Sequence, residues 1–341
     1  MSSIKDVAKR AGVSLSTVSI IVNGKAEERK ISKATQERVR QAMTDLNYYP
    51  NISAKKLKRG YADKLIIALF WTFDFRKGMM SRFFSGLQEK IQVMQANSSI
   101  FIYPYTNGEL YREAENFDGS HFHAAIVANA SKEDLQFLEE LDTVIPIILY
   151  NRFSERFSSV NMNDTLIGQL AADHLYQKGY RNPFILGSHV NFPGASMRRE
   201  AFFAQMSTYG ITIPDENIRN VTNSIAGGAE FIYEHDMTGD RIQSIDAFLC
   251  DSDAIALGLI HALQQYAIPV PDTIGIIAIG NGDPQYTKYS NPSLTVINIP
   301  MEQMAASCYD LIKIHINNPD IKPTQIYFKT ELIARKSTDR Q

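Results

Sequence analysis

The stretch Ile4–Leu46, IKDVAKRAGVSLSTVSIIVNGKAEERKISKATQERVRQAMTDL, decides how the N-terminal part of the chain folds. Apolar residues recur at helical spacing in three short runs, Ile4–Ala11, Leu15–Val22 and Lys33–Leu46. Gly12 stands where the chain must turn after the first run, and glycine accepts the positive φ that such a turn favours. The pattern predicts a helix-turn-helix, whose second helix enters a DNA groove. We expect the chain after Tyr61 to control this unit.

Serines precede the second and third of these helices. Ser14 and Ser32 stand where a side-chain oxygen caps free backbone N–H groups. The second helix should turn an apolar face inward, formed by Val18, Ile21 and Val22. Its outward face would carry mostly short side chains that allow close approach to a phosphate, namely Leu15, Ser16, Ser19 and Ile20.

Charge is divided unevenly along the 341-residue chain, which is long enough for two or three compact units. Residues 1–60 hold thirteen Lys and Arg against five Asp and Glu, whereas the remainder holds 22 against 32. A small basic head on an acidic body suggests that the head binds nucleic acid and that the body is kept away from it. The alternative is a basic face that is merely solvated.

Two cysteines, Cys250 and Cys308, are too few for a disulfide framework and fit a reduced compartment. The N-terminus lacks the apolar core of a signal peptide. The longest apolar run, Leu65–Trp71, has the length of a buried strand rather than of a membrane helix. We therefore expect a soluble, cytoplasmic protein without a membrane partner.

Several runs of the head have fixed spacing. Asp6–Ser19 reads D-V-A-x-x-A-G-V-S-x-x-T-V-S, Val22-Asn23 follows, and Leu46–Asn51 reads L-N-Y-Y-P-N. In these runs the head resembles the lactose/galactose-repressor (LacI/GalR) family of bacterial transcription regulators. The resemblance implies that phosphates are met by Ser14, Thr17, Ser19 and Asn23, that base edges are faced by Leu15, Ser16 and Ile20, and that Tyr48 belongs to the same DNA-binding set.

Two features of the head depart from the family pattern. Many relatives carry an arginine, the usual bidentate reader of guanine, where this chain has Ile20. Ile20 offers only an apolar contact, for instance to a thymine methyl group, so the operator should differ in its outer bases. The loop Gly24–Lys30 is also longer than in many relatives.

The segment Asn51–Lys58, NISAKKLK, is too short for a stable isolated helix because helix nucleation is costly. The family resemblance implies that two such hinge helices, one per subunit, pack together in the minor groove at the operator centre. Ala54 and Leu57 occupy the matching positions, with Leu57 as the wedge that kinks the duplex. Lys56 would add charge toward the phosphates, and Asn51 begins the segment. The alternative is a flexible basic linker.

The rest of the chain alternates strand-like apolar runs with helical patterns, which predicts βαβ units and parallel sheets covered on both faces. Expected strands are Leu65–Trp71, Ser99–Tyr103, Ala124–Ala128, Pro146–Tyr150, Pro183–Gly187, Ile218–Thr222, Ile245–Cys250 and Ile274–Ile279. Expected helices are Phe83–Ala96, Asp164–Lys178, Ser196–Tyr209, Ser252–Tyr266 and Met301–Asn317. The region is large for one sheet, so we expect two Rossmann-like lobes with a ligand cleft at the strand carboxyl ends.

Runs such as Cys250–Gly258 and Asn291–Thr295 resemble, more loosely, the periplasmic-binding-protein-like domain of the same family. The expected fold class is therefore α/β: an N-terminal all-α helix-turn-helix head plus hinge, followed by a two-lobed Rossmann-like periplasmic-binding-protein-like domain. The expected boundaries are 1–49 for the helix-turn-helix DNA-binding domain, 50–60 for the hinge, and 61–341 for effector binding and dimerisation. Lobe one would hold about 61–160 and 291–318, and lobe two about 161–290 and 319–341, with crossings near 160, 290 and 319.

Almost nothing follows the final expected strand, which lies within Glu331–Thr338. We therefore expect the chain to lack the additional heptad helix that makes some family members tetramers, and we expect a homodimer that binds a palindromic double-stranded operator.

The resemblance also implies an effector site, with Arg198 as the effector-binding arginine. A guanidinium fork suits vicinal sugar hydroxyls or an anionic group, and the alternative is a structural ion pair at a helix start. Asp253 follows a strand, where a carboxylate accepts sugar hydroxyls, and its alternative is an acidic residue that favours a helix N-terminus.

Four further residues complete the main effector set. Asn151 and Asn223 match polar pocket positions, and a neutral amide both donates and accepts. Trp71 and Phe73 leave the first strand at its carboxyl end, where the indole is either a stacking floor for a sugar or part of the core.

The run Gly280–Asp283 departs from the family pattern. Gly282 takes the place of an aspartate that often holds the effector. Either Asn281 or Asp283 substitutes for it, or the effector binds differently. Gly194 likewise replaces a polar serine of many relatives. The expected effector is a small molecule, most simply a sugar or sugar phosphate.

Catalytic signatures are missing from the sequence, which has no nucleophile elbow, Walker A loop or zinc-protease motif. His121 and His123 form a pair without a third ligand nearby, so we expect no metal site, no cofactor and no enzyme. The favoured function is a ligand-controlled repressor of carbohydrate-utilisation genes. The alternatives are a carbohydrate-binding protein with a vestigial DNA-binding head and a sugar-processing enzyme, and the intact Ser/Thr set of the head favours the repressor.

Overall fold

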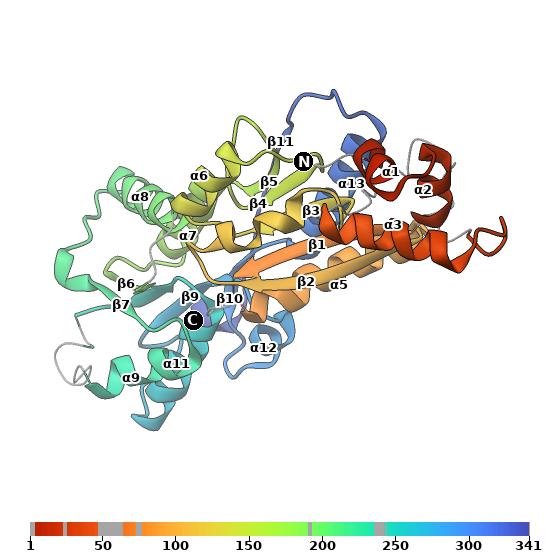
Figure 1. The fold of residues 1–341 in the computed structure, drawn as a ribbon. Helices are drawn as coiled ribbons and strands as arrows, with labels where there is room; N and C mark the ends of the chain where they lie inside the picture. Colours follow the sequence, from red (N-terminus) through yellow and green to blue (C-terminus); the bar gives the residue numbers. More distant parts are fainter. Residues whose placement is uncertain are drawn as a thin grey trace.

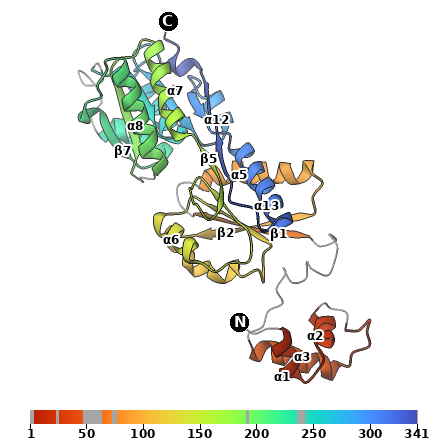
Figure 2. The same ribbon diagram turned by 90° about the horizontal axis from the view of Figure 1, so that it is seen from above.

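The computed structural model describes residues 4–22, 26–46, 64–72, 77–189, 193–234, 242 and 244–340. Three units are seen in these residues, an all-helical head and two α/β lobes (Figures 1 and 2). The predicted fold class is therefore confirmed.

The head consists of α1 (Ile4–Ala11), α2 (Leu15–Val22) and α3 (Lys33–Asp45), as the apolar repeats predict. One buried valine from each helix, Val7, Val18 and Val39, meets the others in its core. Gly12 has the expected positive φ of 63°. Ser14 Oγ accepts from the Thr17 N–H at 3.1 Å, and Ser32 Oγ accepts from the Thr35 N–H at 3.3 Å, so both serines cap their helices.

Lobe one is built on a six-stranded parallel sheet in the order β11-β5-β4-β3-β1-β2. Its strands are β1 (Leu65–Thr72), β2 (Ser98–Tyr105), β3 (Ala124–Ala128), β4 (Ile147–Tyr150), β5 (Ser158–Met162) and β11 (Gln325–Phe328). Its helices are α5 (Lys77–Val93), the 3-10 helix η1 (Leu110–Phe117), α6 (Lys132–Glu140) and α13 (Met301–Asn317).

Lobe two repeats this architecture in the order β12-β10-β9-β8-β6-β7, with only β10 and β12 antiparallel. Its strands are β6 (Pro183–Ser188), β7 (Ile218–Val221), β8 (Ala247–Cys250), β9 (Gly275–Gly280), β10 (Thr295–Asn298) and β12 (Glu331–Ile333). Its helices are α7 (Asp164–Gln177), α8 (Pro193–Thr208), η2 (Asp215–Asn217), α9 (Ile225–Glu234), α11 (Asp253–Gln265), α12 (Pro284–Tyr289) and η3 (Lys336–Thr338).

Helices cover both faces of each sheet, because the strands are apolar on both sides. Along β1, Ile67, Leu69 and Trp71 pack in the cluster that contains α5 and α13, whereas Ala68 and Phe70 pack in the cluster that contains η1. The first of these clusters continues into lobe two through α7 and α8. Both lobes therefore share one continuous apolar core on that side.

The chain crosses between the lobes after Met162, Asn298 and Phe328. The first crossing is close to its predicted place near residue 160, but the other two lie further along than residues 290 and 319. Thr295 pairs with Ile277 of β9, so residues 291–298 lead into lobe two and not into lobe one. Gln325 pairs with Ser159 of β5, so β11 belongs to lobe one and not to lobe two.

Both cysteines are buried and unbridged. Among the residues that the structure describes, no helix is long and apolar enough to cross a membrane.

Candidate functional site

The outward face of α2 is accessible, as the helical pattern predicts. Leu15 is 45% exposed, Ser16 is also exposed, and Ser19 and Ile20 are half-buried. Ser14 Oγ lies 2.7 Å from Ser16 Oγ and 2.8 Å from Thr17 Oγ1, so three hydroxyls meet at the start of the helix. Hydroxyls and free N–H groups at a helix N-terminus are suited to bind a phosphate.

Other predicted site residues lie outside the described part of the chain. They are Asn23, Tyr48, Asn51, Ala54, Lys56 and Leu57 of the predicted DNA-binding set, and Phe73 of the predicted effector set.

A cavity of about 300 Å³ lies where the carboxyl ends of the two sheets meet. Lobe one contributes Met79, Asn129, Leu135, Asn151, Arg152, Phe153, Asn161, Met162 and Tyr327, and lobe two contributes Asp164, Ser188, Pro193, Gly194, Ala195, Met197, Arg198, Asn223, Asp251 and Asn281. Five of the polar members end a strand or directly follow one, namely Asn129, Asn151, Ser188, Asp251 and Asn281. This is the crevice at which open α/β sheets bind ligands.

Two asparagines of lobe one show how the strand ends present side chains. Asn129 directly follows β3 and Asn151 directly follows β4, and both have a φ of 58°. Asparagine adopts this left-handed conformation more readily than most residues. The backbone turns at both positions, and the two amides line the cavity.

Arg198 lies at the cavity and is held by an acidic partner. Its Nε donates to Asp164 Oδ1 at 2.6 Å, and the two side chains are only 11% and 16% exposed. Asp164 begins α7, whereas Arg198 belongs to α8. A Cβ at Gly168 would lie 2.1 Å from the Arg198 carbonyl oxygen. Glycine at 168 therefore lets α7 and α8 pack closely enough for this ion pair.

Asp251 is a second acidic side chain of the cavity and is half-buried. Its Oδ2 accepts from the Ser188 N–H at 2.9 Å and lies 3.9 Å from Arg199 Nη2. Burial raises the pKa of Asp251, while the hydrogen bond from Ser188 and the charge of Arg199 oppose that rise. Gly187 leaves room for the arginine, because a Cβ there would lie 2.5 Å from Arg199 Nη2.

Asn223 and Asn281 complete the predicted residues that reach the cavity. Asn223 Oδ1 accepts from Ser252 Oγ at 2.6 Å, and Ser252 Oγ in turn caps α11 by accepting from the Ile255 N–H at 3.2 Å. The amide of Asn223 is thereby oriented by the start of a helix.

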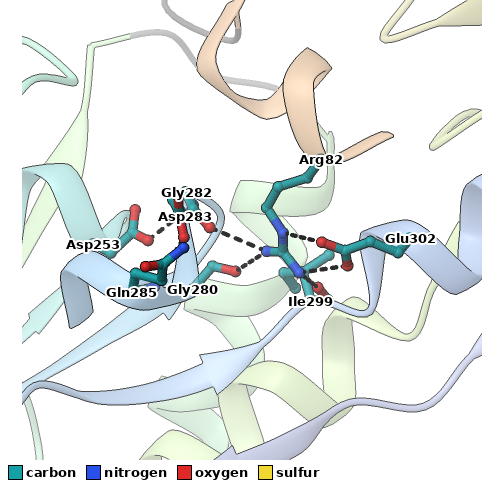
Figure 3. A network of polar contacts seen from close by, with 8 residues as sticks. All are labelled: Arg82, Asp253, Gly280, Gly282, Asp283, Gln285, Ile299 and Glu302. Atoms are coloured by element: carbon teal, nitrogen blue, oxygen red, sulfur yellow. Dashed lines mark hydrogen bonds and ion pairs between the residues drawn. The ribbon is translucent and has the colours of Figure 1, made fainter. Parts of the chain in front are cut away.

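Three other predicted residues do not line the cavity. Trp71 is 2% exposed and packs against Phe83 and Tyr150 with ring centroids 5.4 and 5.9 Å away, so it belongs to the core. Asp253 Oδ2 accepts from the Gly282 N–H at 2.8 Å (Figure 3). Asp283 caps α12 by accepting from the Gln285 N–H at 2.9 Å.

Sequence reasoning missed several cavity residues. Asp251 and Asn129 directly follow predicted strands, so the rule that ligands meet strand carboxyl ends would have found them. Asn161 and Asp164 flank the end of β5, a strand with too few apolar residues to be predicted.

The charged side chains that line the cavity are balanced, with Arg152 and Arg198 against Asp164 and Asp251. Its two carboxylates have Arg198 and Arg199 as partners, and its other polar groups include five asparagine amides. Amides and paired carboxylates donate and accept hydrogen bonds without unbalanced charge, which suits a neutral polyhydroxylated ligand. In the described residues, no group of three His, Cys, Asp or Glu side chains is placed to hold a metal ion.

Comparisons with known proteins give two family matches. Residues 3–51 match the family described as "Bacterial regulatory proteins, lacI family", and residues 172–338 match the "Periplasmic binding protein-like domain". The HTH-type transcriptional regulator MalR of Clostridium butyricum is 27% identical over 346 residues, which cover 98% of each chain.

Solved structures give the same result. The crystal structure of a LacI family transcription regulator from Clostridium acetobutylicum has a TM-score of 0.75 and 35% identity, and the match covers 80% of this chain and 100% of that one. The lac repressor dimer bound to operator and the anti-inducer ONPF has a TM-score of 0.68 and 20% identity, with 99% of each chain covered. These relatives are transcription regulators, which agrees with the prediction that the chain is not an enzyme.

Replacing Asp253 by asparagine tests the burial of its carboxyl group. Burial raises the pKa of Asp253 to about 6 from 3.8, so the folded chain binds this proton more tightly than the unfolded chain. The carboxyl therefore lowers the free energy of unfolding as the pH rises from about 4 to about 6. We expect Asp253→Asn, which keeps an acceptor for Gly282, to stabilise the protein by ~1–3 kcal/mol at about pH 8 and by nearly nothing at about pH 4. Urea titrations at both pH values measure this, and an equal gain at both would contradict it.

Gly168→Ala tests the close packing that positions Arg198. The new Cβ would lie 2.1 Å from the Arg198 carbonyl oxygen, so the backbone of α7 or of α8 must move. We expect a loss of ~1–3 kcal/mol in the free energy of unfolding. Gly78→Ala in α5 is the control, because a Cβ there meets nothing within 4 Å. A similar loss in both variants would argue against a specific contact at Gly168.

Proposed function

The chain belongs to the lacI family of bacterial regulatory proteins and is a DNA-binding transcriptional regulator, and we propose that it is a dimeric repressor of carbohydrate-utilisation genes. In this proposal the head binds a palindromic operator. A sugar in the interlobe cavity controls that binding.

The geometry of α2 supports the DNA-binding part of the proposal. The hydroxyls of Ser14, Ser16 and Thr17 meet at its N-terminus, within 2.8 Å of Ser14 Oγ. Such a cluster is suited to fix the register of a helix on a phosphate backbone. Leu15 and Ile20, also on the accessible side, would then face base edges and favour a thymine methyl group.

The charge balance of the cavity is the observation that carries the choice of ligand. Arg152 and Arg198 balance Asp164 and Asp251 in the lining, and the remaining polar lining is mainly amide. Vicinal hydroxyls match these groups because each hydroxyl both donates and accepts. A volume of about 300 Å³ is at the lower end of the range for small-molecule pockets.

The proposed mechanism is a population shift. A ligand between the lobes contacts both of them, so it favours the interlobe angle that its contacts require. In a dimer that angle sets the separation of the two segments 50–60, which, in this proposal, fold as hinge helices, with Ala54 and Leu57, on the operator. Coupling free energies between such sites are typically ~1–3 kcal/mol.

Selection of bound sequences from random double-stranded DNA tests the proposed function. The full chain should enrich a palindrome whose two half-sites are related by the two-fold axis of the dimer. Enrichment of single half-sites would contradict the proposed dimer. The absence of any enriched sequence would favour a carbohydrate-binding protein with a vestigial head.

Ile20→Arg tests whether α2 reads bases through this position. Arginine donates two hydrogen bonds to guanine, worth ~1–3 kcal/mol of discrimination, so one symmetric pair of operator positions should change to G·C in the selected sequences. Ile20→Leu is the matched control and should leave the selected sequence unchanged. If Ile20→Arg selects the wild-type sequence, Ile20 does not face the bases.

A further inference from the structure

A buried arginine, Arg82, lies between the lobes, outside the cavity (Figure 3). It belongs to α5 of lobe one and is 8% exposed. A charge this deeply buried is tolerated only when its hydrogen-bonding groups are matched.

The Arg82 guanidinium has five N–H groups, and each of them has an acceptor. Nε and Nη2 donate to the two carboxylate oxygens of Glu302, each at 2.7 Å. Nη2 also donates to the Ile299 carbonyl oxygen at 3.0 Å. Nη1 donates to the carbonyl oxygens of Gly280 and Gly282 at 3.3 and 3.2 Å.

These acceptors come from both lobes. Glu302 is in the first turn of α13 in lobe one, and Ile299 lies in the crossing between β10 and α13. Gly280 ends β9 of lobe two, and Gly282 follows it. Arg82 therefore links α5 and α13 to a loop of the other lobe.

That loop, residues 280–283, also forms part of the cavity wall. Asn281 lines the cavity, and its neighbour Gly282 donates its N–H to Asp253 Oδ2 at 2.8 Å. A Cβ at Gly282 would lie 3.0 Å from the same carboxylate oxygen, so a side chain there would require Asp253 or the loop to shift by a few tenths of an ångström. A displacement of Asn281 must therefore alter the contacts of Gly282 with Asp253 on one side and with Arg82 on the other.

The lobe-one end of the link is tightly packed. A Cβ at Gly86 would lie 2.4 Å from the Glu302 carbonyl oxygen, so α5 and α13 touch one turn away from Arg82. The same two helices are joined further along by Lys90 and Asp310, with Nζ and Oδ2 2.8 Å apart. That second ion pair joins the same two helices but makes no contact with the loop, which makes it a matched control.

We propose that Arg82 is the positioning residue that couples the cavity loop 280–283 to lobe one, so that the position of this loop sets the angle between the lobes. This coupling adds a structural basis to the proposed function. Only its effect on operator binding rests on that function. A residue that merely stabilises the fold would lower the melting temperature when replaced. It would not decide how lobe one responds to a change in the loop.

The experiment measures the interlobe distance in the full chain by electron paramagnetic resonance, without DNA or ligand. Spin labels are attached at Lys132→Cys of lobe one and Gln265→Cys of lobe two, two exposed positions, while the native cysteines are buried. Labelled chains are diluted with unlabelled ones. The loop is perturbed with Gly282→Ala, and the response is compared in the wild-type, Arg82→Met and Lys90→Met backgrounds.

We expect Gly282→Ala to shift the distance distribution in the wild-type and Lys90→Met backgrounds and to leave it unchanged with Arg82→Met. Arg82→Lys keeps the charge but not the five donors, so it should behave as Arg82→Met does and replaces it if that variant does not fold. The same Gly282→Ala change should alter the affinity for the selected operator by about fivefold or more only where Arg82 is present.

Two results would overturn the proposal. One is an equal shift with and without Arg82, and the other is no shift after Gly282→Ala in the wild-type background. Since the distance measurement uses neither operator nor sugar, such a failure leaves the proposed repressor function standing. A failed selection of operator DNA, conversely, leaves the distance result intact.

Discussion

Three chain crossings, after Met162, Asn298 and Phe328, bring the carboxyl ends of the parallel strands of both sheets to one shared cavity. Both sheets repeat the same strand order, so Asn129 and Asn151 of lobe one and Asp251 and Asn281 of lobe two all reach it from strand ends. A ligand bound there contacts both lobes at once. Its binding free energy therefore depends on the angle between the lobes, which is the physical basis of the proposed control of the DNA-binding head by a small molecule.

Pairing of buried charges decides what this cavity can bind. Arg198 is hydrogen-bonded to Asp164, Arg199 lies 3.9 Å from Asp251, and Arg82, between the lobes, is hydrogen-bonded to Glu302. Each pair offsets part of the desolvation of its charges. Glycines at 86, 168 and 282 allow the close approaches beside these pairs. The cavity consequently offers amides and matched charges to its ligand, and the loop that carries Asn281 is connected to lobe one through a fully hydrogen-bonded guanidinium.

The head could be predicted from the sequence almost completely, because its helices have local apolar repeats and the second and third have their own caps. The bounds of α1 and α2 are those predicted, and α3 ends one residue earlier, at Asp45. The lobes were predicted less well, since β5, β10 and β11 are short and partly polar and are held by their pairing partners. Missing them misplaced two crossings and hid Asn161 and Asp164 from the site. Three predicted site residues lie near strand ends as expected but do not reach the cavity. The Trp71 side chain packs in the core, and the carboxylates of Asp253 and Asp283 accept from backbone N–H groups.

Reciprocal linkage tests the central claim, that a sugar in the cavity and an operator on the head influence each other. The affinity of the full chain for its selected duplex is measured with and without each of D-ribose, D-galactose, maltose and cellobiose. The affinity for a sugar that binds is then measured with and without the duplex. The account predicts the same factor in both directions, about 5- to 150-fold. A sugar that binds the wild-type chain but not Arg198→Ala, and that leaves operator affinity unchanged, would contradict it.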